Sequence, residues 1–373
     1  MIDSLLSQGE NVFAISSKDE LGEPSTFKGE RFNIIKNCQL ISLPLSKDHK
    51  GYILKYLKIY FSDLIRFHRE LRKVVTINKI DIIIFYNPNV LPLVLSPFMP
   101  KRVTKVYYAA ELLNPRSQPQ YYCIERLLCR KMNMIICCEE NRAKIMQKRY
   151  HLKTTPTVMI NAVPPEYVSL KKNFLRDKLQ IKKTDIVVIY QGEIHSIRCC
   201  YELAAATSQL PEHIKLVLIG KCHDQAYMKK IMDHATVTNS QNRIFHIDKV
   251  PYNELFDYTV GADIGAVFYK NIDENHYYCA PNKLSEYTLC GLAVVGSNFP
   301  GLAEQIEGNQ IGKVANPNSI KEIYSALNSI TESDKTLQMF KKNSGKVYNR
   351  NFNFNTLSSH LIEKISSYAS KKI

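Results

Sequence analysis

Residues 280–287 read Ala-Pro-Asn-Lys-Leu-Ser-Glu-Tyr, and residues 291–297 read Gly-Leu-Ala-Val-Val-Gly-Ser. The first run predicts a loop that leads into a short helix, with Asn282 as its N-cap. Gly291 ends that helix, and the apolar run after it predicts a buried strand. A continuous apolar strand that directly follows a helix is typical of a parallel sheet covered on both faces. This stretch therefore indicates the α/β class.

The same alternation of short apolar runs and helical periodicity extends over most of the chain. The predicted strands are Asn11–Ser16, Ile82–Tyr86, Lys105–Ala109, Met134–Cys138, Thr157–Ile160, Ile186–Gln191, Lys215–Gly220, Arg243–Ile247, Ile264–Phe268 and Ala293–Ser297. The predicted helices are Met1–Gln8, Tyr52–Val75, Gln120–Arg130, Asn141–Arg149, Tyr201–Gln209, Asp224–Ala235, Tyr252–Val260, Lys283–Cys290 and a basic helix over Thr356–Lys372. Repeated strand–helix units of this kind form parallel sheets.

A domain boundary is expected near Asn161–Pro165, before the polar stretch 171–185. We therefore expect two Rossmann-like domains, at 1–165 and 166–350, with the basic helix at 351–373 packing back on the first. The first domain opens on a helix, although a doubly wound sheet usually opens on its central strand. The sequence thus predicts an N-terminal domain that lacks its first strand.

The composition is typical of a folded intracellular chain. Apolar residues make up 45% of 373 residues, and the ten cysteines include no Cys-x-x-Cys pair. Such usage indicates a reducing compartment rather than a disulfide-bonded or zinc-ribbon protein. No charged and then apolar leader follows Met1, so no signal peptide is predicted and a cytoplasmic location is expected. The stretch 80–99 contains Asp81 and three prolines, so it predicts a buried strand and a short helix rather than a membrane span.

Lys283 and Glu286 stand one turn apart at the start of the predicted helix. Free backbone N–H groups and the helix dipole attract anions to a helix N-terminus, and Lys283 would add a charge-assisted contact to phosphate. Glu286 could accept hydrogen bonds from ribose hydroxyls, as acidic residues do in dinucleotide-binding folds. The plain alternative is a surface ion pair between these two side chains on an ordinary helix.

A second candidate anion site follows the predicted strand Ile186–Gln191. Gly192 would let a ligand or another backbone approach closely, and Arg198 stands at the entrance of the next helix. An arginine there suits phosphate, because its guanidinium combines a fixed charge with a planar set of donors. The alternative is a tight turn beside a solvated arginine.

The two segments together resemble the nucleotide-sugar half of the family 4 glycosyltransferases, which are retaining enzymes of group 1 type with the GT-B fold. That family has a strand, a glycine and a basic loop, followed further along by a Pro-Asn-Lys-Leu-x-Glu-Tyr helix and a Gly-x-x-Val strand. Supporting matches lie at Ile124–Leu128, Cys138–Glu140, Asn161–Pro164, Leu216–Gly220, Val250–Leu255, Ala262–Asp263 and Pro300–Gly301. The resemblance covers roughly Lys105 to Ile330, and it implies two Rossmann-like domains that face a central cleft.

The resemblance also implies roles for individual residues. Arg198 and Lys283 would neutralise the donor diphosphate as catalytic residues, Glu286 would hold the ribose, and Glu111 would line the acceptor side. The donor-binding candidates are Gly192, Arg198, Tyr278, Asn282, Lys283 and Glu286. The leaving diphosphate would help to take the acceptor's proton on the same face of the sugar. No metal or other cofactor is expected, because basic side chains and a helix dipole would stabilise the developing charge and the chain has no Asp-x-Asp motif.

Three positions depart from the family pattern. Tyr278 stands where many relatives carry a glutamate, Glu193 follows the glycine where a basic residue is common, and Ala110 replaces a histidine before Glu111. Together with the absent first strand, these departures leave a catalytically inactive binding or scaffold protein as one alternative. A nucleotide-sugar epimerase is another, because the GT-B fold also hosts such enzymes.

The segment 47–79 carries nine basic and three acidic residues among apolar and aromatic ones. A basic amphipathic helix of this kind suits the surface of an anionic membrane. The alternative is a solvated helix with one stripe facing the core. Nucleic acid is not an expected partner, because no recognised binding module accompanies the net charge of +15.

The sequence therefore predicts a glycosyltransferase that moves a sugar from a nucleotide-sugar donor to a glycan or lipid-linked acceptor. Bacterial surface polysaccharide synthesis (lipopolysaccharide, O-antigen or capsule) is the expected setting, with the enzyme peripheral at the inner face of the plasma membrane. No motif specifies the sugar, the nucleotide or the linkage.

Overall fold

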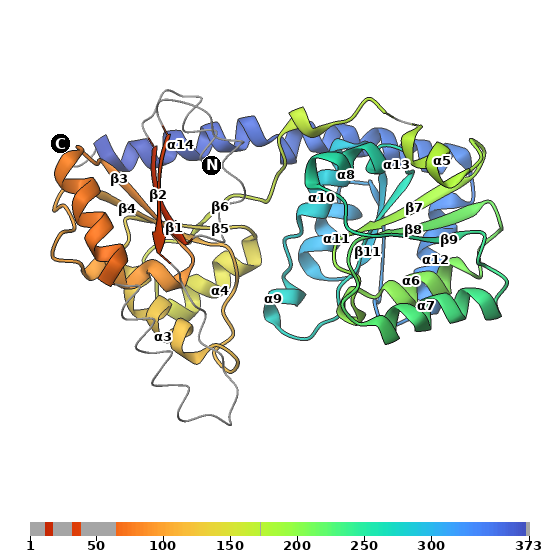
Figure 1. Cartoon of the computed structure of the whole chain (residues 1–373), viewed down its shortest axis with the longest axis horizontal. Coiled ribbons are helices and arrows are strands. Elements are labelled where there is room, and N and C mark those ends of the chain that lie inside the picture. Colours follow the sequence, from red (N-terminus) through yellow and green to blue (C-terminus); the bar gives the residue numbers. More distant parts are fainter. Residues whose placement is uncertain (1–11, 18–31, 39–64, 172, 371–373) are drawn as a thin grey trace. The chain divides into compact units, whose positions relative to one another are not determined.

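The computed structural model describes residues 12–17, 32–38, 65–171 and 173–370. The chain divides into two compact units, one comprising the residues up to Met159 together with those from Asn355 onward, and the other comprising Ile160–Phe354. Both units are built from parallel strands joined by helices, so the α/β class is confirmed (Figure 1). The helix predicted over Met1–Gln8 lies outside the described residues, and so does the region that bears on the predicted absence of a first strand.

The N-terminal unit contains two parallel sheets. Strands β1 (Val12–Ser17) and β2 (Phe32–Cys38) pair with each other, and four more strands lie in the order β3-β4-β5-β6. The bounds of these four are β3 Ile82–Tyr86, β4 Thr104–Ala109, β5 Met134–Cys137 and β6 Thr157–Val158. Apolar runs predict all of these strands except β2, whose sequence is interrupted by Asn33, Lys36 and Asn37.

Helical segments connect these strands. They are a helix over 65–77, η2 (Pro88–Leu95), α3 (Pro119–Leu128), η3 (Cys129–Lys131), α4 (Glu140–Tyr150) and, after the second unit, α14 (Phe354–Ser370). The stretch 80–99 forms β3 and η2, as predicted for a strand and a short helix. Within the described ranges, no helix is long and apolar enough to cross a membrane.

The helix over 65–77 is the described part of the basic stretch 47–79. Phe67, Leu71 and Val74 are buried in the unit's core, so its apolar stripe is used in packing. The exposed basic side chains on it are Arg66, Arg69, Arg72 and Lys73. This part therefore has the core-facing stripe of the alternative interpretation together with a solvated basic face, and residues 47–64 lie outside the described residues.

The C-terminal unit is built on one parallel sheet with the strand order β12-β11-β10-β7-β8-β9. The bounds are β7 Ile186–Gln191, β8 Ile214–Ile219, β9 Ile244–Ile247, β10 Ile264–Val267, β11 Ala293–Ser297 and β12 Gly312–Ala315. β12 is the one strand of this sheet that was not predicted, because its four residues, Gly-Lys-Val-Ala, are too short and too polar to stand out.

Helices cover both faces of this sheet, which explains why its strands are apolar on both sides. One face packs against α6 (Cys200–Thr207), α7 (Gln225–Val237) and α12 (Ile320–Thr331). The other packs against α5 (Phe174–Leu179), α8 (Tyr252–Thr259), α10 (Asn282–Leu289) and α11 (Pro300–Ile306). The remaining helical segments are η4 (Pro165–Tyr167), η5 (Ser196–Arg198), α9 (Glu274–Tyr277), α13 (Asp334–Val347) and η6 (Tyr348–Phe352).

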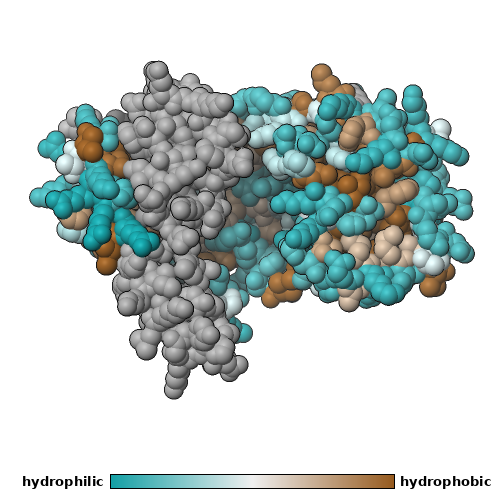
Figure 2. Space-filling model, viewed as in Figure 1, coloured by the Kyte–Doolittle hydropathy of each residue, from teal (hydrophilic) through white to brown (hydrophobic). Residues whose placement is uncertain are grey.

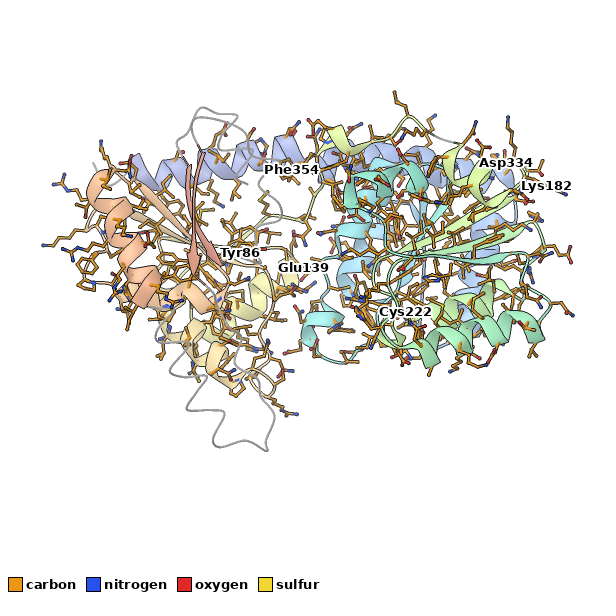
Figure 3. The ribbon with its side chains drawn as sticks, in the orientation of Figure 1. Tyr86, Glu139, Lys182, Cys222, Asp334 and Phe354 are labelled. Atoms are coloured by element: carbon orange, nitrogen blue, oxygen red, sulfur yellow. The ribbon has the colours of Figure 1, made fainter. Side chains whose placement is uncertain are left out.

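The strand order reverses at β7, which lies between β8 and β10. In open parallel sheets, ligands bind outside the carboxyl ends of the strands at such a reversal. Lys182 precedes β7 and Cys222 follows β8, and Figure 3 shows them at opposite ends of the sheet. The end marked by Cys222 is therefore where a site is expected.

Candidate functional site

Two glycines let the loops after β7 and β8 approach each other closely. Gly192 has a φ angle of +123° and Gly220 one of +145°, conformations that other residues rarely adopt. A Cβ atom on Gly220 would lie 1.8 Å from the carbonyl oxygen of Gly192. Gly192 N donates a hydrogen bond to the Ile219 carbonyl at 2.9 Å. The chain therefore turns away from the sheet at Gly192 without a side chain to cover its Cα.

Lys283, in the first turn of α10, lies against this bare glycine. A Cβ atom on Gly192 would lie 3.1 Å from Cε of Lys283 and 3.2 Å from its Nζ. Nζ is also 5.2 Å from the ring centre of Tyr190 and 5.6 Å from that of Tyr269. Gly192 and Lys283, two of the donor-binding candidates, therefore lie close together in the fold although they are far apart in sequence.

Arg198 reaches the same aromatic ring from the loop after β7. Its guanidinium carbon is 4.3 Å from the ring centre of Tyr269, a residue that follows β10. Tyr269 is fixed by Ser297, whose Oγ accepts from Tyr269 N at 2.9 Å and donates to Tyr269 O at 3.0 Å. Both cations lie within 5.6 Å of one ring centre. Among the described residues neither has a carboxylate within ion-pair distance, so this pair is open to an anionic ligand.

Glu286 is buried rather than on the surface, with only 5% of the residue exposed. Its Oε2 accepts from Gln191 Nε2 at 2.5 Å, and its Oε1 accepts from the Tyr252 hydroxyl at 3.0 Å. Thr259 Oγ1 in turn donates to Gln191 Oε1 at 2.8 Å. Burial raises the pKa of Glu286, and the hydrogen bonds from Gln191 and Tyr252 oppose that rise. The alternative of a surface ion pair with Lys283 is therefore wrong.

The N-cap of α10 differs from the prediction. The helix begins at Asn282, so Asn282 is its first residue and Pro281 is the N-cap, with no side-chain hydrogen bond. Pro281 is extended, with φ −76° and ψ 137°, and its carbonyl accepts from Leu284 N at 3.3 Å. Because the proline carbonyl closes the first turn, the helix starts one residue earlier than predicted. The Asn282 side chain is exposed beside Lys283.

The loop before α10 is tied to the start of the C-terminal unit. Asn161 Nδ2 donates to the Ala280 carbonyl at 2.7 Å, and Val163 N donates to Ser285 Oγ at 3.0 Å. Tyr278 lies in the same loop, half-buried, with its ring 4.9 Å from that of Tyr277 in a T-shaped contact. These bonds fix the direction in which α10 presents its N-terminus.

Glu111, the predicted acceptor-side residue, belongs to the N-terminal unit and follows β4. Its side chain is 65% exposed, and its Oε2 is 3.6 Å from Nη1 of the buried Arg142. Arg142 N in turn donates to the side chain of Glu139, which caps α4 and is labelled in Figure 3. Glu111 is thus held at the carboxyl end of the four-stranded sheet.

Sequence reasoning missed the residues that support these side chains. Gln191 and Tyr252 hold Glu286, Thr259 holds Gln191, and Tyr269 lies against both cations. Of these residues, only Gln191 could have been found from the sequence, because it is a polar residue at the end of an otherwise apolar strand. The structure shows that it is almost fully buried. No group of three or more His, Cys, Asp or Glu side chains in the described part of the chain is arranged to hold a metal ion.

A comparison with protein families matches residues 171–347 to the family described as glycosyl transferases group 1. The match lies within the C-terminal unit and includes all the donor-side candidates, whereas Glu111 lies outside it. No curated protein sequence matches the chain.

Solved glycosyltransferase structures share the fold over nearly the whole chain. The sucrose-phosphate synthase of Thermosynechococcus elongatus aligns with a TM-score of 0.75 and 15% identity, over 99% of this chain and 91% of its own. A glycosyltransferase from Rickettsia africae aligns with a TM-score of 0.75 and 14% identity, over 98% and 93%. HepE of Anabaena, solved in complex with UDP-glucose, aligns with a TM-score of 0.70 and 14% identity, over 95% and 99%. The fold is therefore GT-B.

Proposed function

We propose that the loops after β7 and β10 and the start of α10 bind a nucleotide-sugar, because residues 171–347 match the group 1 glycosyl transferases. We propose further that the enzyme passes the sugar to a glycan or lipid-linked acceptor with retention of configuration. Bacterial surface polysaccharide synthesis is the proposed setting. A cytoplasmic location, peripheral to the inner face of the plasma membrane, belongs to the same proposal.

The observation that carries the donor site is the pair of cations around Tyr269. Arg198 and Lys283 lie 4.3 and 5.6 Å from that ring centre, and the N-terminus of α10 adds its dipole. A diphosphate bound there would meet two fixed positive groups and free backbone N–H groups. These groups would stabilise the charge that develops on the diphosphate as the sugar departs, a role that needs no metal ion.

In this proposal Glu286 accepts hydrogen bonds from the ribose of the nucleotide. A carboxylate offers about four acceptor sites, and Gln191 and Tyr252 occupy two of them. The remaining acceptor positions suit a pair of hydroxyl groups. The GT-B fold of HepE was solved with UDP-glucose, which supports a uridine or similar nucleotide as a first donor to try.

Nucleotide binding tests the proposed donor site, and product release tests the proposed sugar transfer. The chain should bind UDP or GDP, and Lys283→Ala and Glu286→Ala should each weaken that binding by about tenfold or more, since each removes a charged hydrogen-bonding partner. With membrane extract as acceptor source and EDTA present, nucleoside diphosphate should be released only when both donor and acceptor are supplied. Unchanged binding in both variants would place the donor elsewhere, and an isomerised donor sugar without acceptor would indicate an epimerase.

A further inference from the structure

A His–Asp pair lies in the loop between β10 and α10, where the family pattern has a glutamate at the position of Tyr278. Nδ1 of His276 is 2.7 Å from Oδ1 of Asp273, and His276 N donates to the same oxygen at 2.8 Å. Asp273 thus caps α9 and fixes the imidazole ring at once. In the tautomer that donates from Nδ1 to Asp273, Nε2 is a hydrogen-bond acceptor.

His276 lies near the same tyrosine ring as the two cations of the proposed donor site. The ring centre of His276 is 6.4 Å from that of Tyr269, the ring that Arg198 and Lys283 also approach. Three nitrogen-bearing side chains from three different segments therefore surround one tyrosine. The side chain of His276 is 23% exposed, and its Nε2 makes no hydrogen bond to any described residue.

From this geometry we propose that His276, oriented by Asp273, accepts a hydrogen bond from a hydroxyl of the donor sugar. The inference rests on the proposed donor site, since the diphosphate held by Arg198 and Lys283 would place the sugar beside it. A neutral acceptor suits a sugar hydroxyl, whereas the cations suit phosphate. His276 is then a specificity-determining residue for the donor sugar.

The proposed contact is with the sugar and not with the nucleotide, so the test compares the affinities for the nucleotide-sugar and for the free nucleoside diphosphate. The full chain is titrated calorimetrically with UDP, UDP-glucose, GDP and GDP-mannose. In His276→Ala, affinity for the nucleotide-sugar that the wild type binds should fall about tenfold, as expected for one lost hydrogen bond, while affinity for the free nucleoside diphosphate stays within twofold. His213→Ala, which changes an exposed histidine at the amino end of β8, should alter neither affinity.

Asp273 provides a second, independent variant. Asp273→Ala frees the ring and should reproduce the selective loss of sugar affinity, although it also removes the cap of α9. Ser333→Ala is the matched control for a lost cap, because Ser333 Oγ accepts from Thr336 N at the start of α13. It should lower thermal stability slightly and leave both affinities unchanged.

The outcomes of these titrations distinguish failure of the sugar contact from failure of the donor site. An equal loss of nucleoside diphosphate and nucleotide-sugar affinity in His276→Ala would mean that His276 acts on the phosphates or on the loop, and it would overturn the sugar contact. No loss in either would overturn it as well. A wild-type chain that binds neither class of ligand would remove the donor site and this inference together, whereas a selective loss supports both.

Discussion

Gly192 illustrates how a single missing side chain creates the candidate site. Its φ angle of +123° disfavours any residue with a Cβ, and such an atom would lie 3.2 Å from Nζ of Lys283, so the lysine would have to shift by a few tenths of an ångström. The sequence predicted glycine's role from its place after an apolar strand. It could not predict that the space would be filled by a lysine from another helix, because that contact depends on tertiary packing.

Gly192→Ala should therefore harm both the fold and the site. The backbone conformation would cost about 1–3 kcal/mol of unfolding free energy for a residue with a Cβ, and Lys283 would be pushed from its position. Nucleoside diphosphate affinity should fall in Gly192→Ala but should not fall further when Lys283→Ala is already present, which a double-mutant titration measures.

Gly291→Ala is the matched control for this substitution. Gly291 also has a positive φ, +69°, but a Cβ there would meet nothing within 4 Å. The Gly291→Ala variant should lose stability without a loss of nucleotide affinity. Equal losses of affinity in the two glycine variants would mean that strain alone, and not the displacement of Lys283, explains the effect.

Glu125 is a buried acid in the N-terminal unit that should make folding depend on pH. Its carboxylate accepts from the Tyr107 hydroxyl at 2.6 Å and from the Tyr150 hydroxyl, and burial raises its pKa to about 7. Because this value lies above the ordinary value of 4.5, the protonated acid stabilises the fold. That contribution is complete below pH 4.5 and is lost as pH rises to about 7.

Urea unfolding between pH 4 and 8 tests this dependence. Relative to Glu125→Gln, which stays neutral, the wild type should lose up to about 3 kcal/mol of unfolding free energy across that interval. Above pH 8 the difference should be constant. Parallel curves for the two proteins would show that Glu125 keeps an ordinary pKa.

At the scale of elements, the predictable parts are those that the local sequence determines. Strands β3, β7 and β11 have the predicted bounds because each is a continuous apolar run with clear ends. The short β12 was missed, and the N-cap of α10 was misplaced by one residue, because the carbonyl of Pro281 closes the first turn. The expectation that Arg198 and Lys283 serve one site came from the family resemblance and not from either segment alone, and the structure brings both cations near the Tyr269 ring.

The network around Glu286 could not be predicted, because it joins three elements. Gln191 at the end of β7 is 95 positions from Glu286, and Tyr252 at the start of α8 is 34 positions away. Local periodicity carries no information on such pairs. The consequence is that α8 and β7 both determine the charge state and orientation of a residue on α10.

Removal of one donor to Glu286 should weaken ribose binding without unfolding the unit. Tyr252→Phe deletes the hydroxyl that bonds Glu286 Oε1 but keeps the ring that packs on Tyr167 and Phe256. The pKa of Glu286 should then rise further, so UDP affinity should fall roughly three- to tenfold and fall more steeply on acidification. Calorimetric titration at pH 5.5 and 8 measures both effects. Tyr258→Phe, on the same helix but bonded to Lys178, is the control and should leave UDP affinity unchanged.

At the scale of the whole molecule, the net charge of +15 raises the question of which surface could bind an anionic partner. On the C-terminal unit, the visible face in Figure 2 is largely hydrophilic around a smaller apolar area. In the N-terminal unit, the helix over 65–77 has a basic exposed face, and Phe67, Leu71 and Val74 on it are buried, whereas Ile65 and Ile77 at its two ends are exposed. Through this described part, contact with an anionic membrane would be mainly electrostatic.

Vesicle binding tests this electrostatic contact. Each basic residue near an anionic surface contributes about 1 kcal/mol, so the triple variant Arg69→Gln, Arg72→Gln, Lys73→Gln should bind phosphatidylglycerol-containing vesicles about a hundredfold less tightly than the wild type. UDP affinity should be unchanged in it. The matched control makes the same charge change on the C-terminal unit at the exposed Lys321, Lys335 and Lys342, and it should retain vesicle binding. Equal losses of vesicle binding in the two triple variants would mean that the net charge, and not this helix, attracts the membrane. Because salt screens charge contacts at the surface, vesicle binding that resists 0.5 M salt would mean that insertion contributes.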